Sequence, residues 1–169
     1  MSNLDVASYN RQGKVFHAAN VAAASVLAVA TTMTGLILCN PYGSRKKLLM
    51  VDAAFVWTTA GAAAHQIGIA VGYSQTAVTH TTPAIIYNAD GSGVSATSVA
   101  LVDVSSTLPV VTTARKWIGG SLGTAVSPYM VNERLDGSII LVPGAYCHLT
   151  TVTTTAVGMG SFTWIEVPE

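Results

Sequence analysis

Charged side chains are scarce in this chain of 169 residues, at 9% of the sequence, against about 25% in an ordinary soluble domain. Eight basic and eight acidic residues cancel to a formal net charge of zero at pH 7. A protein that binds nucleic acid needs clustered Lys and Arg to displace counterions from phosphates. We therefore expect no direct contact with nucleic acid.

The patterns of disorder and of membrane insertion are also missing. Half of the residues are hydrophobic, which excludes an intrinsically disordered chain. The stretch from Ala18 to Cys39 is uncharged, but Asn, Ser, Thr and Gly residues dilute it. Two buried strands joined by a Thr-Thr turn explain it better than a membrane span or a signal peptide. The length favours one domain, and we expect no membrane partner.

Cysteines are few, since Cys39 and Cys147 are the only two. They could form one disulfide, but a domain of this length needs no covalent staple, so two buried free thiols are the favoured interpretation. None of the four histidines has a chelating spacing, which predicts no bound metal or cofactor unless the side chains converge in three dimensions. The histidines are His17, His65, His80 and His148.

The chain does contain short segments rich in Val, Ile, Thr and aromatic residues, separated by turn residues. β-branched residues pack well on a pleated surface, and Asn-Pro, Asp-Gly and Pro-Gly steps favour tight reversals. No segment carries a sustained helical period with caps. We predict strands at Lys14–Ala18, Ser25–Ala30, Thr34–Cys39, Lys47–Thr59, Gln66–Gly72, Ala84–Asn88, Val94–Val104, Val110–Trp117, Ser138–Val142, Tyr146–Thr153 and Ser161–Val167.

Many short strands with regular turns indicate an all-β chain with a single β-sandwich or jelly-roll domain rather than an α/β fold. We place this domain at residues 14–169. Residues 1–13 are polar and lack strand patterning. An extended N-terminal arm that embraces a neighbour and a disordered tail are the two interpretations of that segment.

The scarcity of charged residues also indicates how copies of the chain assemble. From Leu48 to Ala114 the only charged residues are Asp52, Asp90 and Asp103. Thr, Ser and Ala stand where the outer faces of a free sandwich would carry Lys and Glu. Uncharged faces and edges invite pairing with other sheets. We therefore expect these faces to be buried against copies of the same chain in a cyclic homo-oligomer.

One segment matches the residue spacing of a catalytic motif. Gly119–Gly123 fits the Gly-x-Ser-x-Gly pattern with Ser121 as nucleophile, and Asp136 and His148 follow in hydrolase order. That chemistry requires a strained turn from a strand into a helix. No helix is expected here, because Pro128 interrupts the chain soon after the motif. A plain glycine loop is favoured over an esterase, and we expect no enzymatic activity.

Basic residues supply the candidate contacts with a partner. Arg45-Lys46-Lys47 is the one charge run, and either a solvated turn or a contact with an acidic partner surface explains it. Further cations stand in two other polar clusters and in the N-terminal segment. The candidate contact residues are Arg11, Lys14, Arg45, Lys46, Lys47, Arg115, Lys116 and Arg134.

Two segments carry a resemblance to a known family. Gly-Leu-x-Leu-x-Asn-Pro-x-Gly-Ser at Gly35–Ser44 resembles a recurring pattern in small structural proteins of tailed bacteriophages. So does the hairpin at Pro143–Ala145 followed by Ser-Phe-Thr-Trp-Ile-Glu-Val-Pro at Ser161–Pro168. The chain is similar to capsid-decoration (cement) proteins with a TNF-like jelly roll, of the kind found in short-tailed cyanophages.

This resemblance implies a homotrimer on the outer surface of the phage head, made in the host cytoplasm. Such a trimer would clamp neighbouring copies of the major capsid protein, and the family brings no catalytic residues. The alternative is a receptor- or glycan-binding knob of a head or tail fibre. A knob would expose aromatic platforms, for which the candidates are Tyr73, Tyr87, Trp117 and Tyr129. A shell subunit that encloses nucleic acid would need a more basic arm.

Overall fold

The computed structural model describes residues 5–59, 63–94, 97–121 and 130–169 of the chain. These residues form fourteen strands and one short helix, so the all-β prediction is confirmed. The elements are α1 (Val6–Arg11), β1 (Val15–Ala19), β2 (Ala24–Val26), β3 (Thr32–Cys39), β4 (Lys46–Trp57), β5 (His65–Tyr73), β6 (Thr79–His80), β7 (Tyr87–Asn88), β8 (Gly93–Val94), β9 (Leu101–Thr107), β10 (Thr113–Ser121), β11 (Met130–Arg134), β12 (Ile140–Leu141), β13 (Ala145–Thr150) and β14 (Ala156–Pro168).

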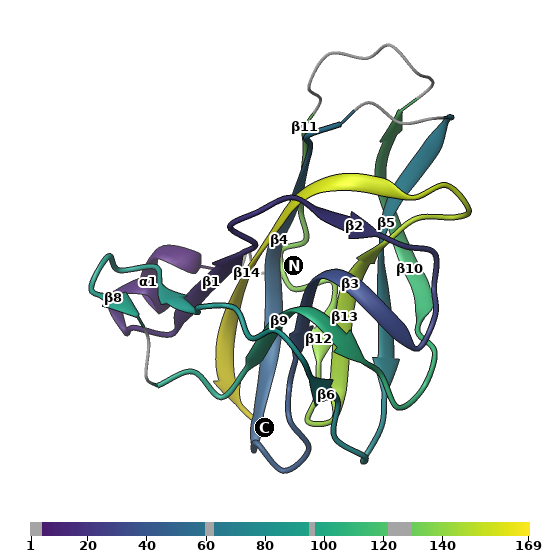
Figure 1. The fold of residues 1–169 in the computed structure, drawn as a ribbon. Helices are drawn as coiled ribbons and strands as arrows, with labels where there is room; N and C mark the ends of the chain where they lie inside the picture. The colour runs from purple at the N-terminus through teal and green to yellow at the C-terminus, as the bar shows by residue number, and fades with distance from the viewer. Residues whose placement is uncertain (1–4, 60–62, 95–96, 122–129) are drawn as a thin grey trace.

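The strands form two antiparallel sheets that face each other (Figure 1). One sheet has eight strands in the order β11-β4-β14-β1-β7-β8, with β12 also beside β4 and β2 also beside β14. The other has six strands in the order β10-β5-β13-β3-β9-β6. The β-sandwich predicted from the sequence is therefore confirmed.

The long strands pair in a nested order. β1 pairs with β14, β3 with β13, β4 with β11 and β12, and β5 with β10. Successive pairs alternate between the eight-stranded and the six-stranded sheet. The chain thus runs as one long antiparallel ribbon that is wrapped across both sheets, so contacts between distant parts of the sequence hold the fold together.

The core between the sheets is built from alternate residues of the long strands. Burial alternates along β4 and β14, which lie side by side in the eight-stranded sheet. Burying one large side chain contributes roughly 1.5–3 kcal/mol, so the period-two pattern that predicted the strands also supplies much of the stability. The large inward side chains of β3, β4, β5 and β14 are Leu36, Leu38, Leu48, Met50, Phe55, Trp57, Ile67, Ile69, Phe162 and Trp164.

The N-terminal segment differs from the extended arm that we expected. Residues Val6–Arg11 form helix α1, and the Asp5 carboxylate caps it by accepting a hydrogen bond from the Ser8 N–H (3.0 Å). Val6 and Tyr9 pack against a small cluster on the outer face of the eight-stranded sheet. The helix therefore covers one end of that face within its own chain.

The strand predictions are wrong in three places. Residues 94–104 are not one strand, because β8 ends at Val94 and β9 begins only at Leu101. Strands β6 and β11 lie where no strand was predicted. β11 pairs with β4 only and stands at the edge of its sheet. An edge strand with polar residues lacks the hydrophobic alternation by which strands are recognised.

Candidate functional site

The eight candidate contact residues lie in two groups. The first group is at one end of the eight-stranded sheet, where β1 and β4 begin and β14 ends. The Lys14 carbonyl accepts a hydrogen bond from the Glu166 N–H (3.0 Å), and Lys47 is the register partner of Val167. We call this group the basic end; it comprises Arg11, Lys14, Arg45, Lys46 and Lys47.

A buried carboxylate holds one lysine of the basic end. The side chain of Glu166 is 1% exposed and accepts hydrogen bonds from Lys46 Nζ (2.8 Å), Ser98 Oγ (2.7 Å) and the Val99 N–H (2.9 Å). A buried carboxylate is tolerated only when it is paired in this way. Lys46 is thus engaged within its own chain, whereas the other cations of the basic end form no ion pair with any residue that the structure describes.

The second group lies where the edges of the two sheets approach each other. Lys116 of β10 forms an ion pair with Glu133 of β11 (2.6 Å), which links the six-stranded to the eight-stranded sheet. Arg134 forms a more exposed ion pair with Asp136 (3.2 Å). Arg115 makes no ion pair with any residue that the structure describes. It is the cation of this group whose charge is unmatched.

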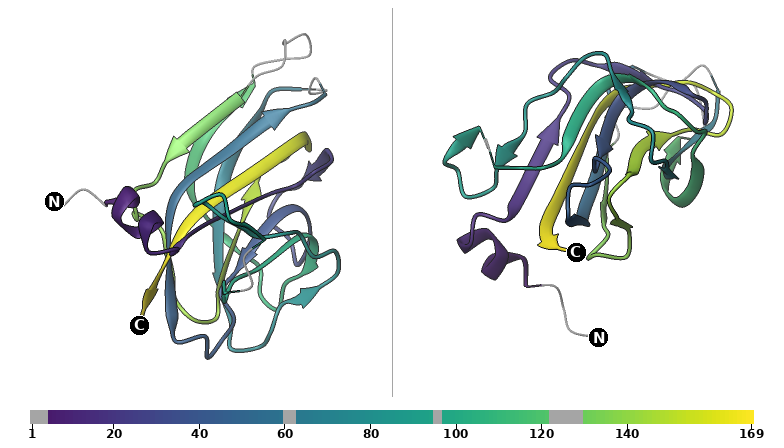
Figure 2. Two further views of the ribbon diagram at one scale, coloured as in Figure 1. Left: turned by 90° about the vertical axis from the view of Figure 1, so that its left-hand side faces the viewer. Right: turned by 90° about the horizontal axis from the view of Figure 1, so that it is seen from below.

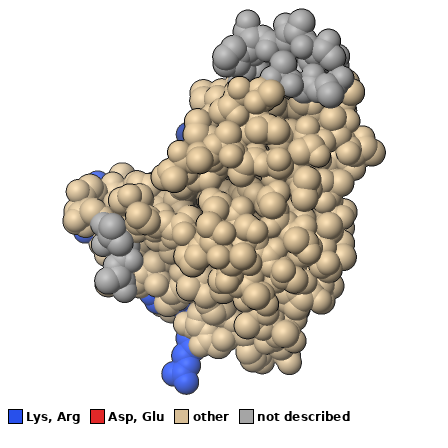
Figure 3. All heavy atoms as spheres, viewed as in Figure 1, with Lys and Arg blue, Asp and Glu red and all other residues tan. Residues whose placement is uncertain are grey.

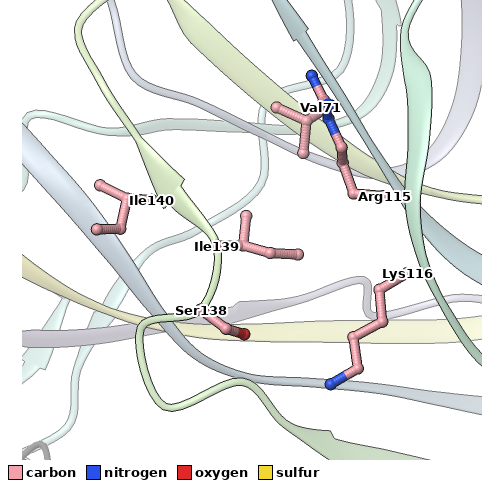
Figure 4. Close-up of a pocket in the computed structure, with 6 residues that line it drawn as sticks. All are labelled: Val71, Arg115, Lys116, Ser138, Ile139 and Ile140. Carbon is pink, nitrogen blue, oxygen red and sulfur yellow. The ribbon is translucent and has the colours of Figure 1, made fainter. Parts of the chain in front are cut away.

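A pocket of about 530 Å³ opens beside this second group (Figure 4). Lys116 extends from β10 towards the turn at Ser138, and Arg115 lies beside Val71 (Figure 4). Isoleucine side chains form the opposite wall, so the pocket joins a cationic wall to an apolar one. Its lining residues are Val71, Arg115, Lys116, Ser138, Ile139 and Ile140.

The outer face of the eight-stranded sheet is only partly covered. Figure 2 (left) shows β11, β4, β14 and β1 side by side, with α1 at one end of the sheet. The register places three rows of outward side chains across these strands, and all of them are half-buried or exposed. We call these rows the open sheet face: Met130, Val56 and Met159; Asn132, Ala54, Ser161 and Ala19; Arg134, Asp52, Thr163 and His17.

The open sheet face carries almost no charge. Its two charged residues, Arg134 and Asp52, are register partners in the row next to the covered end. The other two rows hold small, apolar and amide side chains only. A solvated sheet face normally carries the charged half of the strand alternation. The side of the molecule seen in Figure 1 is similarly poor in charge, with Lys and Arg atoms along its left and lower margins (Figure 3).

Three of the aromatic candidates lie on three different strands. Tyr87 is 38% exposed and stacks on His17 at the border of the open sheet face. Trp117 is 48% exposed and lies against Gly68 on β5. Tyr73 is 51% exposed at the end of β5. The remaining candidate, Tyr129, lies outside the described residues.

The residues of the esterase alternative are not brought together. Ser121 is the register partner of His65 at one end of β5, whereas His148 is the partner of Ala70, five residues along. Five residues of a strand span roughly 16 Å. His148 contacts Thr112 and a backbone carbonyl, and Asp136 contacts Arg134 in an exposed turn. A triad needs hydrogen bonds between its members, which this arrangement does not provide.

Burial controls the ionisation of the two cysteines. Both thiols are free and buried, as predicted. Cys147 pairs with Leu38 and Cys39 pairs with Tyr146 in the β3–β13 register, so the two thiols point to opposite faces of the sheet. Desolvation raises the pKa of Cys39 to about 12 and also raises the pKa of Cys147. Both sulfurs therefore stay protonated, whereas the reactive form of cysteine is the thiolate.

His148 is the buried histidine with a shifted pKa. Desolvation lowers its pKa to about 4. Its Nε2 is 2.7 Å from Thr112 Oγ1, and its Nδ1 is 2.7 Å from the Leu149 carbonyl oxygen. Because that carbonyl can only accept, Nδ1 carries the proton and Nε2 accepts from the Thr112 hydroxyl. Among the described residues, no group of three or more His, Cys, Asp or Glu side chains is arranged to hold a metal ion.

The chain matches no protein-family model, and no curated protein is significantly similar to it. No helix within the described part of the chain is long and apolar enough to cross a membrane.

The sequence predicts uncharged outer faces, but it does not show which strands form the open sheet face. The alternation around β4 contains the signal, since Ala53 and Phe55 are buried while Asp52, Ala54 and Val56 face outwards. The sequence does not show the register that places β11, β14 and β1 beside these positions. That register depends on pairing between segments that are far apart along the chain.

Proposed function

We propose that the chain is a structural subunit that associates with copies of itself through the open sheet face. The observation that carries this proposal is the composition of the two uncharged rows, in which Ala54 and Ser161 stand at the centre. A sheet face that remains in water would be expected to carry Lys or Glu there. Small, uncharged side chains suit close packing against another sheet or loop.

The open sheet face by itself is too small to form a stable interface. Four strands about 4.8 Å apart and five residues long cover roughly 300 Å². A stable interface needs about 800 Å² from each partner. The open sheet face would therefore form the centre of an interface that also draws on neighbouring loops. Helix α1 and the exposed Tyr87 border the face and are suited to this.

We further propose that the sandwich is a TNF-like jelly roll and that the subunit is a homotrimeric decoration (cement) protein on the outer surface of a phage head. The nested pairing of β1 with β14, β3 with β13, β4 with β11, and β5 with β10 supports the jelly roll, because such a fold is a wrapped antiparallel ribbon. The phage assignment rests on the sequence resemblance at Gly35–Ser44 and in the C-terminal strands.

In this proposal the major capsid protein is the second partner. The basic end is suited to meet an acidic surface of the shell, because only Lys46 among its cations is paired with a buried carboxylate. Many weak contacts of this kind add up when the copies are linked in a trimer. The neutral net charge agrees with a protein that has no direct contact with nucleic acid or membrane.

Self-association is tested by placing a charge at the centre of the face. We expect Ala54→Lys to weaken self-association at least about a hundredfold, because an unpaired charge would be buried in the interface. Ala23→Lys, at an exposed loop position, is the matched control. Light scattering coupled to size exclusion measures the mass, and circular dichroism checks the fold. Equal masses for the two variants would contradict the proposal.

A second function is a receptor- or glycan-binding knob. The observation in its favour is that Tyr73, Tyr87 and Trp117 are each half exposed in the single subunit. Exposed aromatic side chains with a polar end are suited to recognition. Burial of these side chains on assembly would favour the decoration protein, whereas continued exposure would favour the knob. Fluorescence quenching of Trp117 by iodide before and after assembly separates the two.

A further inference from the structure

A second pocket, of about 240 Å³, lies at the end of the six-stranded sheet. It is bounded by the turn after β3, the loop after β5 and the turn before β13. Tyr146 forms part of its floor and is 1% exposed. The lining residues are Cys39, Asn40, Pro41, Tyr42, Ser74, Gln75, Thr76, Ala77, Val78, His80, Leu101, Gly144 and Tyr146.

Tyr42 lines this pocket, and the ring of Tyr73 lies beside its lining residue Gly144. Tyr42 is 57% exposed and Tyr73 is 51% exposed. Gly144 lies between them with φ +91°, and a Cβ atom there would be 3.3 Å from the Tyr42 ring, 3.1 Å from the Tyr73 ring and 2.7 Å from the Ser74 carbonyl oxygen. The absence of a side chain at Gly144 lets both rings approach the same turn, while about half of each side chain stays accessible.

Several polar groups around the pocket are available to a ligand. The side chains of Gln75 and Thr76 are exposed and form no hydrogen bond with any residue that the structure describes. His80 directs Nδ1 to the buried Asp103 carboxylate, which leaves Nε2 for another partner. The lining residues include no Lys, Arg, Asp or Glu. A ligand would therefore meet amide, hydroxyl and imidazole groups beside an aromatic surface.

We propose that this pocket binds one unit of a neutral sugar. A sugar ring has an apolar C–H face that packs on a tyrosine ring, and hydroxyl groups that exchange hydrogen bonds with side chains such as Gln75 and Thr76. A purely apolar ligand would leave these groups unpaired, which costs binding energy. Drug-sized ligands occupy about 300–1,000 Å³, so this smaller pocket suits a single ring. The inference rests on the second proposed function, the glycan-binding knob.

The test is saturation-transfer NMR and calorimetry with the methyl glycosides of glucose, galactose, mannose and N-acetylglucosamine. We expect at least one of them to bind, with glucuronic acid binding more weakly because no Lys or Arg lines the pocket. Tyr42→Ala should weaken binding about tenfold through lost ring contact, and Gln75→Ala about fivefold through one lost hydrogen bond. Ile85→Ala, which removes an exposed side chain elsewhere, should leave the affinity unchanged. Tyr87→Ala and Trp117→Ala test whether the sugar binds instead at another exposed aromatic ring.

The outcomes distinguish failure of the sugar-binding pocket from failure of the knob function. Sugar binding that is lost in Trp117→Ala or Tyr87→Ala, and kept in Tyr42→Ala, would overturn the pocket and leave the knob function standing. Failure of all four glycosides to bind would overturn the pocket proposal, whereas the knob function, which includes receptors other than glycans, is tested separately by the iodide quenching of Trp117. Glucuronic acid binding more tightly than the neutral sugars would contradict the neutral ligand class. Unchanged thermal unfolding of Tyr42→Ala and Gln75→Ala would show that any loss is local.

Discussion

His148 should make the stability of the protein depend on pH. Its ring is buried on β13, where Nε2 accepts a hydrogen bond from Thr112 and Nδ1 donates to the Leu149 carbonyl. Both nitrogens are therefore used in the neutral form. Protonation would place a charge in a site that is buried away from water, and this desolvation lowers the pKa of His148 to about 4.

The sign and size of the pH effect follow from the pKa of His148 in the unfolded chain, 6.5, and in the folded chain, about 4. Above pH 6.5 the ring is neutral in the folded and the unfolded chain, so it contributes nothing. As the pH falls from 6.5 towards 4, the unfolded chain binds a proton that the folded chain does not, and the free energy of unfolding decreases. The loss attributable to His148 is about 2 kcal/mol at pH 5 and approaches about 3 kcal/mol at pH 4.

The assay is urea unfolding at pH 7.5 and pH 5.0, at one fixed protein concentration because assembly also affects stability. The comparison is between the natural chain and His148→Gln, which keeps an amide able to hydrogen-bond but cannot titrate in this range. We expect the natural chain to lose about 2 kcal/mol more than the variant between these pH values. Equal losses for the natural chain and His148→Gln would refute the reasoning.

Three further predictions concern the interior. Glu166→Ala should lower the free energy of unfolding by about 3 kcal/mol, because Ser98 and Val99 lose a buried acceptor. A loss below 1 kcal/mol in urea unfolding would show that the hydrogen bonds to Glu166 are dispensable. Cys39 and Cys147 should not react with a thiol reagent at pH 8 until the chain is unfolded, because both are buried and protonated; rapid labelling of the native protein would contradict this. Phe162→Ala should cost about 3–5 kcal/mol through the cavity left in the core, and calorimetry should show a correspondingly lower melting temperature.

Sequence reasoning located most strands because their residues alternate between core and surface. Lys47–Thr59 and Gln66–Gly72 were predicted within a few residues of β4 and β5, which contribute inward residues such as Phe55 and Ile69 to the core. Helix α1 escaped detection because it is only six residues long. Helices this short depend on tertiary packing rather than on propensity, and here Tyr9 supplies that packing.

The candidate sites were less predictable than the strands, because they depend on which loops and strands meet. Gly35–Ser44 was singled out for its resemblance, yet its Tyr42 borders a pocket whose other walls come from Gln75 and Gly144. Nothing in the local sequence joins these three positions. The wrapped ribbon brings them together only after β3, β5 and β13 have paired.

Sedimentation equilibrium of the natural chain measures whether the subunit associates with copies of itself. The subunit mass is 17.4 kDa, so a trimer would have a mass of about 52 kDa, three times that value. We predict that the purified protein sediments with the trimer mass at micromolar concentration. A single species of 17.4 kDa over the whole concentration range would contradict the central claim, because the open sheet face would then remain in water.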